Sequence, residues 1–305
     1  MAAERVLVLG ASGRVGRLMR GCWTPDVART EPVYQSRSAR TDGDIVVDPS
    51  KANHAALRTA LEGSGADAMV VLWGVTTPRP DWPLSGNTSY ALKALDLASE
   101  LGLEHVVLMS SAAIYRASPD AAPFRETDDQ TPPLSDYGLA KRAMEAAATA
   151  WYRRRSGHRH VPNLTILRLA NVVGADMLGD SIRTCGLDRP LRLDRFADGT
   201  TPRRSYLSPR SLVRALDAIL RAPATAGVQT FNLADTRDGL EMQDILQVCR
   251  DLGRDVVWQH HPAPATAIPS VLVDSTRFLA RYPRAAAGFR TSAADLVADW
   301  LAVED

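Results

Sequence analysis

Apolar residues occur along the chain in short runs, and between these runs the apolar positions recur with the spacing of an amphipathic helix. Runs of this length, rich in valine and leucine, are typical of strands that are buried on both faces. The predicted strands cover residues 6–9, 31–37, 44–48, 66–74, 105–111 and 164–171; one predicted helix begins near Arg14 and others cover 51–61, 88–101 and 137–150. This alternation predicts an α/β fold with a doubly wound parallel sheet.

The regular alternation ends beyond Gly174. Residues 180–202 are rich in arginine, aspartate and glycine, and we expect binding loops there. Further on, the pattern predicts short elements at 212–220, 229–233, 241–252, 256–260 and 292–303. Because no stretch has the composition of a linker, we expect a first domain over residues 1–172 and a smaller substrate-binding region over 173–305 that partly interleaves with it.

Three glycines, at positions 10, 13 and 16, directly follow the first predicted strand. They would allow a sharp turn, a close approach of the backbone to a pyrophosphate, and tight packing of the next helix on the strand. The N-terminal N–H groups of that helix would face the phosphates. The pattern therefore predicts the loop of a Rossmann-type NAD(P)-binding domain, with Gly10, Ser12, Gly13, Arg14, Val15 and Gly16 as contact residues.

The second predicted strand ends in Gln35, Ser36 and Arg37. A carboxylate at this point would bind the adenosine ribose of NAD(H) and repel a 2′-phosphate. Here Arg37 and Arg14 supply two guanidiniums and no carboxylate, which favours NADP(H) over NAD(H). The alternative is that Arg37 is a solvated loop cation.

Three further positions belong to the predicted cofactor site. Asp48, at the end of the third strand, either binds the adenine amino group or caps the next helix. Trp73, at the end of the fourth strand, either walls the cofactor cleft or belongs to the core, and Gly74 follows it.

The fifth predicted strand ends in Ser111, and Tyr137 and Lys141 are spaced to share one face of a helix. A tyrosine with its ordinary pKa of about 10 is a poor acid or base at neutral pH. A lysine ammonium one turn away favours the phenolate, so the tyrosine can exchange a proton with an alcohol or carbonyl while a nicotinamide carries the hydride. With a serine hydroxyl on the same oxygen, the set suits reversible oxidation of a secondary alcohol.

Together these motifs resemble those of the extended short-chain dehydrogenase/reductases, the NAD(P)-dependent epimerase/dehydratase family. The matching segments, in family order, are residues 10–16, 110–115, 126–133, 135–141, 167–174 and 204–207. The resemblance implies that Ser111, Tyr137 and Lys141 are catalytic and that Lys141 holds the nicotinamide ribose. It also implies that Asn171 and Arg204 contact the sugar and phosphates of a nucleotide-sugar substrate.

The residues after Ser111 separate the branches of this family. Sugar 4,6-dehydratases have Asp-Glu there, and members that epimerise C3 and C5 have a cysteine at the position of Ala113. This chain has Ala112 and Ala113, which move no protons, so we expect neither activity. The remaining activities are those that need only a hydride transfer and the transfer of one proton: a ketone reductase, an alcohol dehydrogenase or a C4 epimerase.

Because epimerases commonly retain NAD, the NADP(H) prediction favours an oxidoreductase that reduces a ketone or oxidises a secondary alcohol. A nucleotide-sugar-like substrate is the family's most frequent class. One alternative is an NAD-dependent C4 sugar-nucleotide epimerase. A second is a non-catalytic dinucleotide-binding sensor.

Composition limits the classes of molecule that this protein is expected to bind. A net charge of +1 gives no reason to expect nucleic acid. Three cysteines lack the spacing of a metal site or a disulfide framework, and neither a signal peptide nor a membrane-spanning run is visible, so we expect no metal and a cytoplasmic protein. Cations over 180–206 suit a phosphorylated or nucleotide-linked small molecule, or are paired in a solvated loop. The helices at 88–101 and 137–150 are expected to form a homodimer interface.

Overall fold

The computed structural model describes residues 3–38, 41–80, 82–115, 122–128, 135–157, 160–222 and 227–304. Residues 129–134, which carry part of one family-like segment, therefore lie outside the described residues. None of the described helices combines the length and the apolar composition that a membrane span requires.

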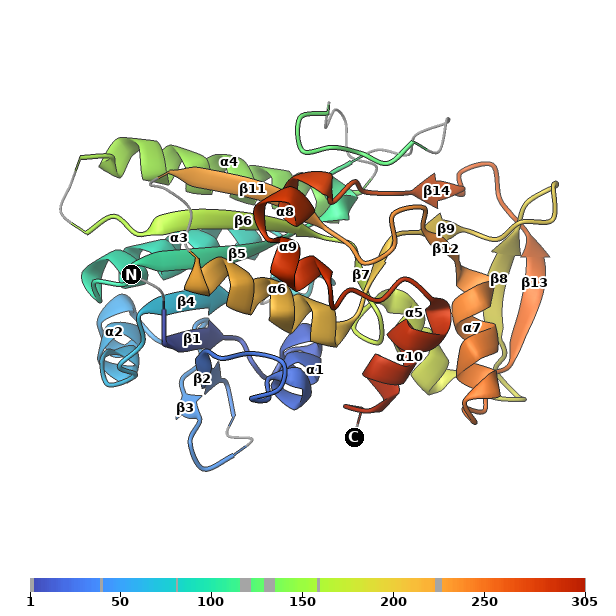
Figure 1. Cartoon of the computed structure of the whole chain (residues 1–305), viewed down its shortest axis with the longest axis horizontal. Helices are drawn as coiled ribbons and strands as arrows, with labels where there is room; N and C mark the ends of the chain where they lie inside the picture. Colours follow the sequence, from blue (N-terminus) through green and yellow to red (C-terminus); the bar gives the residue numbers. More distant parts are fainter. Residues whose placement is uncertain are drawn as a thin grey trace.

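Seven strands form the central sheet in the order β11-β6-β5-β4-β1-β2-β3 (Figure 1), and every neighbouring pair is parallel. The strands are β1 (Arg5–Leu9), β2 (Glu31–Ser36), β3 (Ile45–Val46), β4 (Ala68–Val71), β5 (His105–Ser111), β6 (Asn163–Leu169) and β11 (Val228–Leu233). The predicted α/β fold with a parallel sheet is confirmed. Because the strands are parallel, their carboxyl ends meet at one edge, where such sheets bind ligands.

Alternate residues of each strand face opposite sides of the sheet, and helices cover both sides. Val6 and Val8 pack in the same cluster as buried residues of α1 (Arg14–Cys22) and α6 (Pro209–Arg221). Leu7 and Leu9 pack in the other cluster, beneath helices α2 (His54–Glu62), α3 (Gly86–Glu100) and α4 (Asp136–Arg155). The fully buried strands explain why their sequences are apolar at successive positions.

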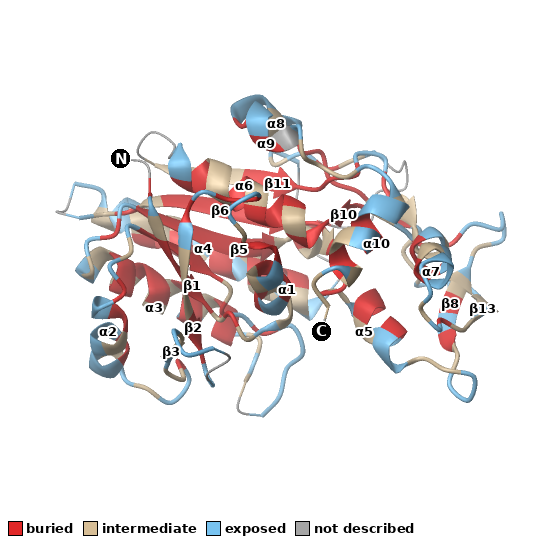
Figure 2. Cartoon of the chain, turned by 60° about the horizontal axis from the view of Figure 1, so that its bottom comes forward, coloured by how far each residue is buried: buried red, intermediate tan, exposed pale blue. Residues whose placement is uncertain are grey.

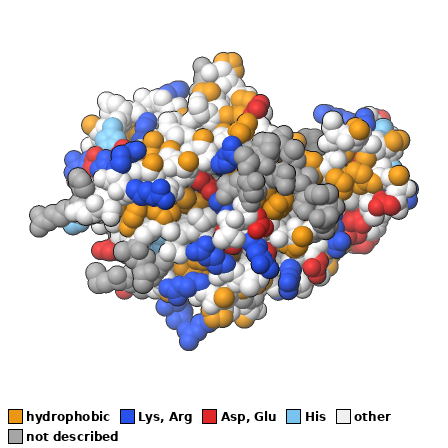
Figure 3. Space-filling view, turned by 90° about the horizontal axis from the view of Figure 1, so that it is seen from above, with side chains coloured by type: hydrophobic (Ala, Val, Ile, Leu, Met, Phe, Trp, Pro, Cys, Tyr) orange, Lys and Arg blue, Asp and Glu red, His pale blue; other side chains and the backbone are white. Residues whose placement is uncertain are grey.

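The second half of the chain adds small sheets and helices near the carboxyl edge of the central sheet (Figure 1). These elements are β7 (Asn171–Val172), α5 (Met177–Thr184), β8 (Leu191–Arg195), β9 (Arg203–Arg204), β10 (Tyr206–Leu207), β12 (Leu240–Glu241), α7 (Met242–Asp251), β13 (Trp258–Pro262), β14 (Ser270–Val271), α8 (Thr276–Arg281), α9 (Pro283–Ala286) and α10 (Ala293–Leu301). In the first half, the short helix η1 (Ala112–Ile114) directly follows β5. Figure 2 shows buried residues in the strands of the central sheet and also in the helices that cover it, such as α3 and α6. The face in Figure 3 carries both basic and acidic side chains.

The expected binding loops over residues 180–202 are only partly loops. This stretch contains the end of α5 and all of β8. In β8, Leu191 and Leu193 are buried while Arg192 is exposed, a strand alternation that the high polar content masks. The helix expected at 51–61 begins later, at His54, because Asn53 accepts a hydrogen bond from the Ala56 N–H and caps it.

Candidate active site

The glycine loop lies between β1 and α1. Gly10 has a φ of +83°, which L side chains rarely adopt. A Cβ on Gly16 would lie 2.6 Å from the Ala11 Cα, so α1 can pack this closely only on a glycine. Gly13 caps α1 without a side chain, which leaves the first turn of the helix to an anion. The loop therefore fits the diphosphate of a dinucleotide.

Gln35 braces this loop from beneath, a role that the sequence did not indicate. Its Oε1 accepts hydrogen bonds from the Gly10 N–H at 3.0 Å and the Trp73 indole N–H at 2.8 Å. Its amide donates to the Val47 carbonyl at 2.6 Å. Trp73 is only 7% exposed and packs edge-on to Tyr90, which supports the core alternative for this residue over the cleft-wall alternative.

The end of β2 retains polar groups where an adenosine ribose is expected. The Ser36 hydroxyl is buried and has no hydrogen-bond partner within the described part of the chain. The Arg37 guanidinium lies 5.0 Å from the centre of the Trp82 ring. An unpartnered buried hydroxyl at this place fits a nicotinamide dinucleotide, because a ribose hydroxyl would satisfy it.

Asp48 lies close to this end of the site but does not cap α2. Its carboxylate accepts from the Ser50 N–H at 2.9 Å and the Ser50 hydroxyl at 2.6 Å. Burial opposes ionisation, yet these hydrogen bonds hold the pKa of Asp48 below its ordinary value.

Ser111, Tyr137 and Lys141 come together at the carboxyl edge. Ser111 ends β5, and the other two occupy the first turns of α4. The Ser111 hydroxyl is close enough to the Tyr137 hydroxyl to favour the phenolate form of the tyrosine. The Lys141 ammonium lies 5.9 Å from the centre of the Tyr137 ring and donates to the Met109 carbonyl at 2.8 Å. The three predicted catalytic residues are thus positioned as one group.

Burial changes the proton affinities of both titratable members. It raises the pKa of Tyr137 to about 12, against the opposing effects of the Ser111 hydroxyl and the Arg14 charge. It lowers the pKa of Lys141 to about 8, against the opposing effect of Glu145. Before ligands bind, the resting pair at neutral pH is therefore a neutral phenol beside an ammonium.

Gly74 and Asn87 form the wall beside Lys141. A Cβ on Gly74 would lie 3.4 Å from the Lys141 Nζ and 3.1 Å from the Asn87 Oδ1. Asn87 is fully buried; its side chain accepts from the Val75 N–H at 3.2 Å and donates to the Val75 carbonyl at 2.9 Å. Asn87 thereby fixes the chain that leaves β4, another role absent from the sequence analysis.

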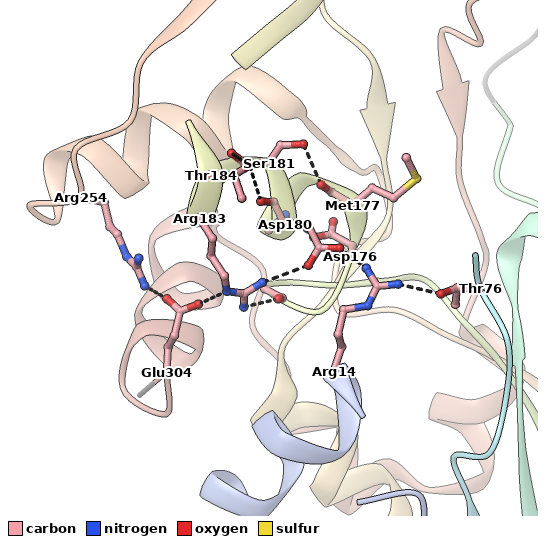
Figure 4. A network of polar contacts seen from close by, with 12 residues as sticks. Arg14, Thr76, Asp176, Met177, Asp180, Ser181, Arg183, Thr184, Arg254 and Glu304 are labelled. Atoms are coloured by element: carbon pink, nitrogen blue, oxygen red, sulfur yellow. Dashed lines mark hydrogen bonds and ion pairs between the residues drawn. The ribbon is translucent and has the colours of Figure 1, made fainter. Parts of the chain in front are cut away.

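Arg14 points from the start of α1 toward the second half of the chain (Figure 4). It forms an ion pair with Asp180 of α5 and donates to the Thr76 hydroxyl at 2.7 Å. Asp180 also pairs with Arg183, whose Nε is 2.6 Å from Glu304. Arg14 and Arg37, which were predicted to bind a 2′-phosphate together, therefore have separate partners in the structure: Arg14 pairs with Asp180, and Arg37 lies over Trp82.

The predicted substrate residues lie on the short strands beyond the central sheet. Asn171 begins β7 and donates its backbone N–H to the Ser205 carbonyl. Arg204 donates to the carbonyls of Arg203, Ile268 and Pro269 at 2.7, 3.0 and 3.2 Å. A phosphate contact by Arg204 stays a prediction, and these carbonyls would compete for its donors.

Comparisons with known proteins agree with this geometry. Residues 6–234 match the model of the "NAD dependent epimerase/dehydratase family". The chain is 29% identical over 187 residues, 58% of its length, to a UDP-glucose 4-epimerase of Azospirillum brasilense, and 39% identical over 89 residues, 29% of its length, to one of Streptococcus mutans. The alignments span 52% and 25% of those relatives.

Among solved structures, the UDP-glucose-4-epimerase of Stenotrophomonas maltophila with bound NAD and formylated UDP-arabinopyranose superposes with a TM-score of 0.78. It shares 18% identity with this chain, and the match covers 98% of both chains. This likeness supports the fold, and the family match covers both the glycine loop and the Ser111–Tyr137–Lys141 group. The chain therefore belongs to the NAD-dependent epimerase/dehydratase family.

Proposed function

We propose that this protein is an NAD-dependent 4-epimerase of a UDP-sugar. The Ser111–Tyr137 pair beside Lys141 carries the proposal, because Ala112 and Ala113 follow it as bare methyl groups in η1. Such a site can move one proton at one sugar oxygen, and C4 epimerisation needs no more. The comparisons support this alternative better than the ketone reductase that the sequence favoured, since the curated relatives are 4-epimerases.

The roles of the side chains follow from their positions. When bound, the dinucleotide would supply the hydride chemistry: removal of a hydride from C4 of the sugar and its return to the opposite face of the same carbon. In its phenolate form, which the positive charge of a bound oxidised nicotinamide would favour, Tyr137 would take the proton of the 4-hydroxyl and later return it to the same oxygen, beside the Ser111 hydroxyl. The Lys141 ammonium would favour the phenolate of Tyr137 and bind the nicotinamide ribose.

The test uses purified protein and a UDP-hexose. UDP-glucose is incubated with and without added NAD, and the anomeric proton of its 4-epimer is followed by NMR. We expect the galactose epimer to form without net reduction of cofactor. If NAD is instead reduced in proportion to product, the protein is a dehydrogenase that oxidises a secondary alcohol, the reverse direction of a ketone reductase.

One observation favours that second candidate. The end of β2 carries Ser36 and Arg37 and no carboxylate, so the site lacks the group that repels a 2′-phosphate. The NADP(H) preference is therefore retained as part of the reductase proposal, although the solved neighbour contains NAD. A non-catalytic sensor would form no 4-epimer and would reduce no cofactor in this assay.

We also propose a cytoplasmic homodimer with α4 at its interface. Ala91, Ala94 and Ala98 of α3 are buried within the chain itself, so they offer no surface to a partner. Ala143 of α4 is exposed and Ala147 is half-buried. Sedimentation as a monomer at all concentrations would contradict the dimer.

A further inference from the structure

A buried ion pair joins α4 to β6 one helical turn beyond Lys141. The Arg168 Nη2 lies 2.8 Å from the Glu145 Oε2, and the Arg168 Nε is 3.1 and 3.2 Å from the two carboxylate oxygens. The side chains are only 6% and 9% exposed. Because apolar residues of similar volume often stabilise a core as well as a buried ion pair does, stability alone does not explain these charges.

The carboxylate end of this pair contacts the strand that carries the catalytic serine. The Ser110 hydroxyl donates to Glu145 at 2.5 Å, and the next residue is Ser111. One turn earlier in α4, Lys141 donates to the Met109 carbonyl of the same strand. Two bonds at successive strand residues therefore hold α4 and the end of β5 in a fixed relation.

The guanidinium end is anchored as firmly. The Arg168 Nη1 donates to the Tyr115 hydroxyl at 2.8 Å and to the Glu126 carbonyl at 3.0 Å. Tyr115 in turn donates to the Asn232 Oδ1 at 2.7 Å, across to β11. Arg168 is thus held on both sides and cannot turn away from Glu145 without breaking several buried hydrogen bonds.

The groups packed against Lys141 are few. Its own helix provides Tyr137 and Glu145, β5 provides the Met109 carbonyl, and the wall at Gly74 and Asn87 is uncharged. Among the described residues, Glu145 is the charged group whose field acts on Lys141, and it favours the ammonium form.

We propose that Glu145 is a positioning residue: its carboxylate, held by Arg168, keeps Lys141 an ammonium ion and fixes α4 against the strand end that carries Ser111. Its effect on turnover rests on the proposed epimerase function. Its effect on the charge of Lys141 does not, so the two can fail separately.

The charge of Lys141 can be measured without a substrate. The chain has three lysines, Lys51, Lys93 and Lys141, so trace acetylation by acetic anhydride followed by peptide mass spectrometry reports each amine separately. Only the neutral amine reacts, and the pH dependence of labelling gives its midpoint. Lys51 and Lys93 are internal references.

We expect Glu145→Gln to lower the midpoint of Lys141 by about one pH unit, because an opposite charge one helical turn away in the buried part of α4 is removed. Glu145→Asp, which keeps the charge, should restore the midpoint. Ser110→Ala loses the bond to β5 but leaves the charge, so it should leave the midpoint in place. An unchanged midpoint in folded Glu145→Gln would overturn the proposal.

Two further measurements keep the proposal testable. If Glu145→Gln does not fold, the double variant Glu145→Gln/Arg168→Gln leaves no uncompensated charge, and its midpoint must also be lowered. In turnover, Glu145→Gln should reduce kcat with little change in KM and shift the alkaline limb of the pH profile to lower pH. An equal loss at every pH would indicate a merely structural role and contradict the proposal. If the wild-type chain epimerises no UDP-sugar, the labelling result still decides the electrostatic part.

Discussion

Lys141 lies 5.9 Å from the centre of the Tyr137 ring, and burial acts on the two side chains in opposite directions. The lysine loses affinity for its proton while the tyrosine gains it. The proposed mechanism requires a charge on Lys141, and the buried environment opposes that charge.

A consequence for stability can be tested with Lys141→Met. In the folded protein the pKa of Lys141 is lowered from 10.5 to about 8, so between these values the unfolded chain holds more protons. Burying the charged lysine costs unfolding free energy. This cost is present in full below pH 8 and disappears as the pH rises from 8 to 10.5, so the wild-type protein gains stability over that interval. We expect Lys141→Met to be more stable at pH 7, on the order of 1–2 kcal/mol, by urea unfolding. The gain should shrink at pH 9.5; an equal gain at both pH values would contradict this cause.

Removal of the Tyr137 hydroxyl tests the proton-transfer role. Tyr137→Phe should lower kcat by roughly 10²–10⁴-fold, because general acid–base catalysis contributes that much. Binding of the dinucleotide should change little. Tyr152→Phe, in the same helix, is the matched control and should retain full turnover. Equal activity of the two variants would remove Tyr137 from the mechanism.

Gly16 tests the dinucleotide loop. Gly16→Ala places a methyl group 2.6 Å from the Ala11 Cα, so α1 must move away from β1. We expect a loss of about 1–3 kcal/mol in unfolding free energy together with strongly weakened NAD binding. Gly63→Ala, whose Cβ meets nothing within 4 Å, is the control, to be compared by urea unfolding and fluorescence titration. Unaltered NAD binding in Gly16→Ala would place the diphosphate elsewhere.

Cofactor choice is tested at Arg37 and Arg14. If Arg37 binds a 2′-phosphate, Arg37→Ser should weaken NADPH binding about tenfold or more and leave NADH binding unchanged, as followed by nicotinamide fluorescence. Arg14→Gln should leave the NADPH-to-NADH ratio alone, because its guanidinium is held by Asp180 and Thr76. Wild-type protein that prefers NADH, or retains NAD through dialysis, would contradict the NADP(H) preference and support the epimerase.

The central strands β1, β4 and β5 were predictable because they are buried on both faces and are therefore mostly apolar at successive positions, whereas β2 and β11 are only partly buried. The catalytic group could also be predicted from local sequence, because one strand end supplies Ser111 and one helix face supplies Tyr137 and Lys141. The predicted start of α2 was less accurate, because the Asn53 cap decides where that helix begins.

Other features depend on contacts that no local pattern contains. Arg14 and Asp180 are 166 residues apart in the sequence, and Gln35 meets Trp73 across 38. The short strands of the second half, such as β8, are stabilised by partners like β13 rather than by their own composition. The polar sequence of β8 therefore led to the prediction of a loop.

The place of β11 at the edge of the central sheet also bears on how the protein is made. During synthesis, one edge of β6 stays unpaired until the whole of β11, which ends at Leu233, has left the ribosome. Asn232 of that late strand also completes the contacts of Tyr115 and, through it, of Arg168. A nascent chain that stalls earlier would thus expose an open strand edge to other chains, and we expect chaperones to be needed most in that interval.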